Sequence, residues 1–321
     1  MKKGVMYIGL STLLFSTMEI VLKTISNDFN PIQLTLSRFL IGGIILLPFA
    51  IKTIKNKKVK FNLSDLKYFS LLGFICVVIS MICFQLAVLN TKASVVAVLF
   101  SCNPLFVMFL AYFLLKEKIY RHNIISLILE LIGIIIITNP INNNLSFTGI
   151  SFTLLAAITF AIYGVLGKRK CLKFGGIVVT CFSFLLGSME MLILTLFTRI
   201  DFISNALTSK GLGIFADVPL FKGYSVSNLL GVIYIFVFVT GIGYALYFKA
   251  MEETTANTTS LIFFFKPALA PILALIILKE SIPLNMIIGI IFILVGSITS
   301  ILPSLLVKKK TIAESSVEIC K

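Results

Sequence analysis

Charged side chains, cysteine and histidine are scarce in this chain of 321 residues, and tryptophan is absent. Charged residues make up 13% of the chain, whereas a soluble domain carries about 25%. The six cysteines are too few for a secreted disulfide scaffold, and no two of them form a C-x-x-C pair. His122 is the one histidine and has no ligand partners nearby in sequence, so we expect neither a metal site nor a cofactor.

Apolar sequence takes the place of these residues. Hydrophobic residues make up 58% of the chain and the mean hydropathy is +1.06, which excludes a disordered chain and argues against a soluble enzyme. A bilayer core of about 30 Å is crossed by about 20 helical residues. Charges and turn residues divide the apolar sequence into ten such runs, at 5–25, 31–51, 67–89, 94–115, 123–138, 149–167, 176–198, 229–248, 256–278 and 284–306. The sequence therefore predicts an all-α polytopic membrane protein with ten transmembrane helices.

Lysine and arginine predict the orientation of these spans, because basic residues are enriched in cytoplasmic loops. If the N-terminus lies inside, 20 of the 28 basic residues fall in cytoplasmic segments, 6 fall outside and 2 lie within spans. This split favours a multi-pass protein of the cytoplasmic membrane with both termini in the cytoplasm. It also accounts for the net charge of +15 without a nucleic-acid partner. The loop 199–228 would face outward, and its glycines and proline predict irregular structure.

An internal repeat organises the spans. A shift of 163 residues superposes 91–119 on 254–282 and aligns Pro104 with Pro267 and Glu117 with Glu280. A shift of 145 residues aligns the earlier spans, for example Gly42 with Gly187. Each copy holds five spans, an odd number, so the second copy is inverted in the membrane, as in many secondary transporters. We expect residues 1–139 to form the first repeat, 146–306 the second, and 307–321 a cytoplasmic tail.

These features resemble the EamA-type members of the drug/metabolite transporter superfamily. The resemblance rests on Phe15 to Lys23, on Arg38-Phe39, and on the two aligned stretches that end at Lys116-Glu117 and Lys279-Glu280. It covers about residues 4–306. It implies a ten-helix fold and the export or exchange of small metabolites or drugs, without naming a substrate. Glu19 departs from the common pattern of the first span.

Ionisable residues inside the spans are candidate functional groups, because burying a charge in the bilayer is costly. Glu19 and Arg38 lie about 10 Å deep from the same surface, which predicts an ion pair across the first hairpin, a cation- or proton-binding role for Glu19, or both. Glu190 lies on a stripe of small and polar residues, which indicates a helix interface or a wet cavity. Glu130 is expected to have a structural or dimer-contact role.

Two prolines mark the region where a substrate would bind. Lys266-Pro267 and its repeat mate Asn103-Pro104 lie near mid-span, where each proline removes a backbone donor. The alternative is a packing kink alone, although Lys266 favours a binding role. Tyr163 and Tyr244 could contribute to an aromatic cage, but such residues more often fill a core. The candidate pathway residues are Glu19, Arg38, Asn103, Pro104, Tyr163, Glu190, Tyr244, Lys266 and Pro267.

We predict a secondary transporter that moves an amino acid, an amine or a related metabolite by alternating access, as an exporter or an exchanger, and not an enzyme. Its expected partners are the small-molecule substrate and the bilayer, while a coupling proton or ion and a homodimer stay open. Two alternatives remain. A membrane-embedded transferase would need paired acidic residues for Mg²⁺, and no D-x-x-D pair occurs; a non-transporting scaffold needs no motif. ATP coupling lacks the G-x-x-x-x-G-K-[ST] loop.

Overall fold

The computed structural model describes residues 2–138, 146–263, 266–296 and 298–299, and every regular element among them is helical. The elements of the first half are α1 Lys2–Ser16, α2 Met18–Ile25, α3 Pro31–Lys57, α4 Leu63–Gly73, η1 Phe74–Ser80, α5 Met81–Asn90, α6 Ala93–Phe100, α7 Asn103–Leu115 and α8 Arg121–Thr138. Those of the second half are α9 Phe147–Phe174, α10 Gly176–Phe197, α11 Asp201–Ser209, η2 Gly213–Phe215, α12 Leu229–Ile233, η3 Tyr234–Gly243, α13 Tyr244–Glu253, α14 Ala256–Ser260, η4 Leu261–Phe263 and α15 Lys266–Leu278. A further apolar helix runs over Leu284–Gly296.

Seven helical segments of the described chain are long and apolar enough to cross a membrane. They are Lys3–Ile25, Pro31–Lys57, Leu63–Asn90, Ala93–Leu115, Phe147–Phe174, Gly176–Phe197 and Leu229–Glu253. The other three expected spans correspond to α8, to the interrupted segment α14–η4–α15 and to the shorter helix Leu284–Gly296. The last part of the tenth expected span and the expected tail 307–321 lie outside the described residues. The chain is therefore an all-helical protein with at least seven candidate spans.

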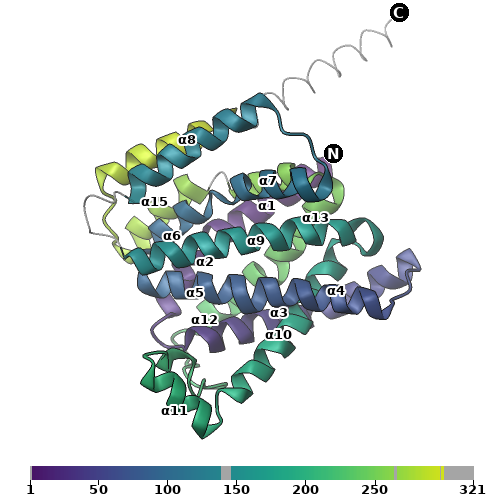
Figure 1. Cartoon of the computed structure of the whole chain (residues 1–321), viewed down its shortest axis with the longest axis vertical. Coiled ribbons are helices and arrows are strands. Elements are labelled where there is room, and N and C mark those ends of the chain that lie inside the picture. Colours follow the sequence, from purple (N-terminus) through teal and green to yellow (C-terminus); the bar gives the residue numbers. More distant parts are fainter. Residues whose placement is uncertain (1, 139–145, 264–265, 297, 300–321) are drawn as a thin grey trace, which may run out of the picture.

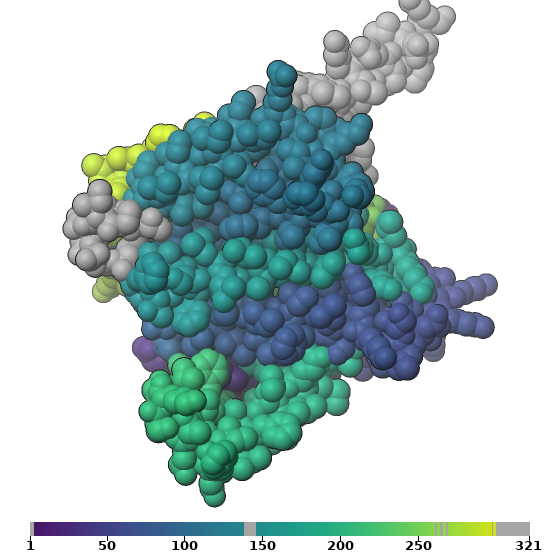
Figure 2. All heavy atoms as spheres, in the orientation of Figure 1, coloured from purple at the N-terminus to yellow at the C-terminus, as the bar shows by residue number. Residues whose placement is uncertain are grey.

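The spans run across the page in Figure 1 and pack side by side. Helices α4 and α13 lie toward one end of this bundle, the α4 end, whereas α2, α5 and α11 lie toward the other, the α11 end. Helix α8 forms the upper edge of the molecule in Figures 1 and 2. Several of its large apolar side chains are exposed, including Ile124, Ile125, Ile128, Leu131 and Ile135. An exposed apolar surface of this kind is typical of a lipid-facing helix.

Several spans are interrupted at positions where the sequence disfavours a continuous helix. The first span breaks at Thr17, between α1 and α2. The fourth breaks at Ser101 and Cys102, directly before Asn103-Pro104. Proline has no amide proton and is tolerated in the first turn of a helix, which agrees with the place of Pro104 as the second residue of α7. The expected kink in this span is therefore a full break.

The loop 199–228 contains regular structure that its glycines did not predict. Residues 201–209 form the nine-residue helix α11, followed by the short η2 turn. Helix α11 ends near Gly211, whose φ of +73° lies in the left-handed region that glycine adopts without strain. The glycines therefore limit α11 instead of preventing it, and Figures 1 and 2 show α11 projecting from the body of the bundle.

Glycines allow several helices to approach closely. A Cβ on Gly187 of α10 would lie 2.6 Å from the carbonyl oxygen of Gly73 in α4. A Cβ on Gly133 of α8 would lie 2.7 Å from the carbonyl oxygen of Gly289 in the helix Leu284–Gly296. Small residues at such crossings are characteristic of membrane helix packing, because they bring backbones into van der Waals contact.

Candidate functional site

A buried ion pair joins the first span to the segment expected as the ninth. Glu19 lies in the first turn of α2, directly after the break at Thr17, and Lys266 is the first residue of α15. The Lys266 Nζ donates to the Glu19 Oε1, and both side chains are 0% exposed. The predicted ion pair between Glu19 and Arg38 was wrong, because Glu19 pairs with Lys266 instead. Equal depth in one hairpin does not fix side-chain direction, and α2 packs against α15.

Aromatic rings surround the ammonium group of Lys266. Its Nζ lies 5.1 Å from the ring centroid of Phe100, 5.7 Å from that of Phe263 and 6.0 Å from that of Phe84. Ring faces at these distances stabilise a cation. The second carboxylate oxygen of Glu19, Oε2, has no hydrogen-bond partner among the described residues. The pair is thus held in an apolar setting with one acceptor unused.

Arg38 lies in α3 and is also 0% exposed. Its Nη1 is 3.9 Å from the Met18 Sδ, and its guanidinium carbon lies 4.8 Å from the ring centroid of Phe39. Its Nε and Nη2 have no hydrogen-bond partner in the described part of the chain. Tyr244 and Glu19 are among its ionisable neighbours. Arg38 is therefore a buried cation with weak contacts only.

A cluster of aromatic side chains fills the space between these charged groups. Phe15 packs against Tyr244 with ring centroids 4.9 Å apart, and Phe39 packs against Phe184 at 4.6 Å. The Tyr244 hydroxyl contacts the Met81 Sδ at 3.1 Å. The remaining members extend the cluster to α9 and to η4: Phe100, Phe160, Tyr163, Tyr247 and Phe263. Phenylalanines, rather than tyrosines, contact Lys266.

The other polar candidates fall into two groups. Asn103 lies at the break before α7, donates to the Ala157 carbonyl at 2.9 Å and leaves its Oδ1 without a partner among the described residues. The hydroxyls of Tyr163 and Ser183 lie 2.9 Å apart in the core. Pro104 and Pro267 are the second residues of α7 and α15. These residues border the aromatic cluster or the breaks.

Glu190 and Glu130 lie in helix–helix contacts elsewhere. Glu190 of α10 accepts a hydrogen bond from the Ser70 Oγ of α4. Glu130 of α8 accepts from the Ser126 Oγ at 3.1 Å, and its Cγ would lie 3.3 Å from a Cβ on Gly296. Neither carboxylate is recorded in contact with the Glu19–Lys266 pair.

Two glutamates cap helices of the opposite half of the chain. Glu280 accepts hydrogen bonds from the amides of Ala93 and Ser94 at 2.8 and 3.1 Å, at the start of α6. Glu117 accepts from the amides of Ala256 and Asn257 at 3.1 and 3.3 Å, at the start of α14. The sequence analysis used both glutamates to align the repeats but assigned them no role. Their alignment in the two copies indicated a shared role, but the sequence did not indicate which amides they bind.

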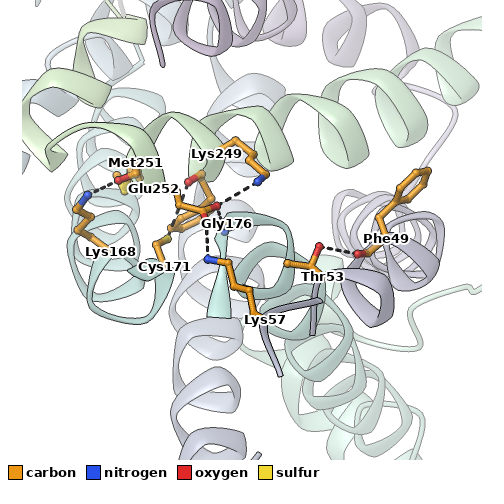
Figure 3. Close-up of polar contacts among 10 residues, drawn as sticks. Phe49, Thr53, Lys57, Lys168, Cys171, Gly176, Lys249, Met251 and Glu252 are labelled. Carbon is orange, nitrogen blue, oxygen red and sulfur yellow. Dashed lines mark hydrogen bonds and ion pairs between the residues drawn. The ribbon is translucent and has the colours of Figure 1, made fainter. Parts of the chain in front are cut away.

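Two lysines bind helix C-termini in the same reciprocal manner. The Lys23 Nζ donates to the carbonyls of Val88 and Thr91 at 2.7 and 3.0 Å. The Lys168 Nζ donates to the carbonyls of Met251 and Thr254 at the α4 end (Figure 3). A lysine at this position is favourable because carbonyls at a helix C-terminus lack helical partners.

Glu252 collects three further contacts at the α4 end. Lys57 and Lys249 both point toward its carboxylate in Figure 3, at 2.6 and 3.2 Å. The amide of Gly176, at the start of α10, donates to the same carboxylate at 2.9 Å. The network therefore ties together the end of α3, the start of α10 and the end of α13. Across the described ranges, no three His, Cys, Asp or Glu side chains gather as a metal site would require.

Comparison with known proteins places the chain among membrane transporters. The model of the EamA-like transporter family matches residues 2–139 and again 147–302. An uncharacterized transporter of Clostridium kluyveri is 42% identical over 306 residues, 93% of this chain and 93% of the relative. An uncharacterized transporter of Archaeoglobus fulgidus is 25% identical over 268 residues, 83% and 87% of the two chains. A crystal structure at 14% identity has the same fold, with a TM-score of 0.67 over 94% of this chain and 98% of that one. The chain belongs to the EamA-like transporter family.

Proposed function

We propose that this multi-pass membrane transporter is a secondary active carrier that moves a small metabolite across the cytoplasmic membrane by alternating access. The observation that carries the proposal is the Glu19–Lys266 pair, which is fully buried and joins α2, directly after the interruption at Thr17, to the first residue of α15. Buried ionic groups in membrane helices are costly and generally functional. Interrupted helices around such groups form the substrate and ion sites of many secondary transporters.

Ten spans in two inverted repeats, 1–139 and 146–306, belong to the same proposal. It is supported by contacts that exchange when one copy is superposed on the other. Glu280 caps Ala93, whereas its aligned mate Glu117 caps Ala256. The backbone crossing between Gly133 and Gly289 has its counterpart between Gly296 and Ser126. Two similar halves of opposite orientation can exchange conformations, which would expose a central site to each side in turn.

The proposed substrate pathway centres on Glu19, Lys266 and Arg38, with Asn103 and Tyr244 beside them. Tyr163, Pro104 and Pro267 would shape the surrounding core and its breaks. Glu190 would act through the α4–α10 contact and not on the substrate, because its recorded partner is Ser70. The substrate would be an amino acid, an amine or a related metabolite, exported or exchanged, and a proton or ion could couple through Glu19. Both termini would lie in the cytoplasm.

Flux through reconstituted protein tests this function. Purified protein in proteoliposomes should release or exchange at least one radiolabelled metabolite from a panel of amino acids, amines and organic acids. Lys266→Met should strongly reduce that flux, whereas Lys210→Met, at an exposed residue that follows α11, should not. A chain that carries none of these solutes would support the scaffold alternative, and turnover of a prenyl diphosphate would support the transferase.

A further inference from the structure

The buried charges of the central cluster do not balance. Glu19 provides one negative charge, while Lys266 and Arg38 provide two positive charges, and all three side chains are 0% exposed. Lys266 has its carboxylate partner. Arg38 has no ion pair with any residue that the structure describes, in contrast to Lys170 and Lys173, which both bind Asp65. An unmatched guanidinium in an apolar interior strongly favours the binding of an anion.

The unused donors of Arg38 have a specific geometry. The N–H bonds of Nε and Nη2 lie in the guanidinium plane and point toward the same edge of the group, and both nitrogens lack a partner in the described ranges. This side of the group matches the two oxygens of one carboxylate in a bidentate contact. The other edge of the guanidinium is occupied, because Nη1 faces the Met18 sulfur.

The neighbours of Arg38 limit what the rest of such an anion can be. Phe39 and Met18 place an aromatic ring and a thioether beside the guanidinium, and Tyr244 packs against the Phe39 ring. Rings of the same cluster continue toward Lys266 and its carboxylate partner. A strongly hydrated anion would lose its hydration there without compensation, whereas an apolar or aromatic body would pack against these rings.

We propose that Arg38 forms an anion subsite that holds the carboxylate of an apolar or aromatic monocarboxylate through its Nε and Nη2. The inference rests on the proposed transport function, because it assigns the substrate class of the same central site. The subsite belongs to the first half of the chain alone. The shift of 145 residues aligns Arg38 with Ser183, whose hydroxyl lies 2.9 Å from that of Tyr163.

Ligand-dependent thermal unfolding of the purified full chain, in a buffer without chloride or small carboxylates, tests the subsite. Benzoate should raise the unfolding midpoint saturably, whereas its neutral isostere benzamide should not. Arg38→Gln should remove the response to benzoate, Arg38→Lys should raise the half-saturating concentration at least tenfold, and Lys210→Gln should behave as wild type.

Three results would each overturn the proposal. The first is an equal response to benzoate and benzamide, and the second is a benzoate response that Arg38→Gln retains. The third is a wild-type protein that responds to none of acetate, phenylacetate and benzoate. Stabilisation by inorganic phosphate alone would overturn it as well.

Two further measurements separate this subsite from the transport function. Without added anion, Arg38→Gln should unfold at or above the wild-type midpoint, because it removes an unmatched charge; a clear fall would mean that Arg38 is already satisfied and would contradict the subsite. In proteoliposomes, flux of a non-anionic solute that survives Arg38→Gln would refute the subsite and leave the transporter standing. Benzoate binding through Arg38 without flux of any solute would refute the transporter and leave the subsite standing.

Discussion

Glu19 and Lys266 depend on each other for their charge, since both are removed from solvent and each is the other's ionic partner. Removing one member of such a pair leaves an uncompensated buried charge, which costs about 3–5 kcal/mol, whereas removing both is often nearly neutral. The rings of Phe100 and Phe263 add stabilisation to the cation only. Loss of Glu19 therefore leaves Lys266 partly stabilised, while loss of Lys266 leaves Glu19 without a partner.

A pair of double-mutant cycles tests this arrangement. Glu19→Gln and Lys266→Met should each lower the free energy of unfolding by about 3–5 kcal/mol, and the double variant should recover much of that loss. The cycle of Glu19→Gln with Arg38→Met should show a smaller interaction energy, because the structure records no bond between those side chains. Denaturant unfolding in a fixed detergent measures both cycles. Additive losses for Glu19 and Lys266 would contradict the ion pair.

At the scale of elements, the contact between α4 and α10 depends on two glycines that place their backbones against each other. A Cβ on Gly187 would lie 2.6–2.8 Å from three backbone atoms of Gly73. Backbone atoms cannot rotate away as the end of a side chain can, so a larger residue would force the helices apart.

Gly187→Ala should therefore lower the free energy of unfolding by about 1–3 kcal/mol. The matched control is Gly9→Ala in α1, where no atom lies within 4 Å of the added Cβ. That control should be neutral or gain up to about 1 kcal/mol, because alanine favours a helix more than glycine does. Thermal or denaturant unfolding of the two variants under one condition measures the difference. Equal effects would mean that the α4–α10 contact tolerates expansion.

The reciprocal glutamate caps give a second prediction at this scale. Glu280 binds two amides and the Ser94 hydroxyl, the latter at 2.6 Å, whereas Glu117 is recorded with two amides. Loss of a capping side chain costs about 0.5–2 kcal/mol. Glu280→Ala should destabilise the protein more than Glu117→Ala, and the Gln variants should lie between because an acceptor remains. Denaturant unfolding measures the order, and a reversed order would show that the number of bonds does not decide the cap strength.

At the scale of the whole molecule, the two ends of the bundle differ in the segments that they expose. Each end of the bundle has an exposed residue at which a cysteine can be introduced for labelling. Ser209 is the last residue of α11 at the α11 end, and Lys60 lies between α3 and α4 at the α4 end. The five cysteines within the described residues are buried, so they should contribute little background labelling.

Labelling of intact cells with a membrane-impermeant maleimide tests the proposed orientation. A cysteine at Ser209 should react from outside, because the charge distribution places the loop 199–228 on that face. A cysteine at Lys60 should react only after the membrane is permeabilised. The wild-type chain corrects for native cysteines, including Cys320. The opposite pattern would invert the orientation while leaving the fold unaffected.

Patterns that depend on composition and local chemistry were predictable, whereas contacts set by three-dimensional packing were not. Apolar runs predicted the helical class, and Pro104 predicted a disturbed helix, because proline acts on its own backbone. The partner of Glu19 depends on which helix packs against α2, and the contact between α2 and α15 is not predictable from the spacing of residues along the chain. The capping role of Glu117 depends on the position of the other half of the chain, which spacing along the sequence does not encode.

The network around Glu252 has a kinetic consequence for a carrier of this design. Its aligned position in the first copy is Leu89, so the α11 end has no carboxylate there to bind basic residues from neighbouring helices. Opening the α4 end would break the contacts of Glu252 to Lys57 and Gly176, and the aligned Leu89 has no carboxylate with which to form their counterparts at the α11 end. If the contacts that close the α4 end and the α11 end differ in strength, the two conformations open at one end or the other are unequally populated at rest. The carrier would then be kinetically asymmetric: the substrate concentration that half-saturates transport would differ between the two sides of the membrane. The direction of net movement would still be set by the solute gradient alone.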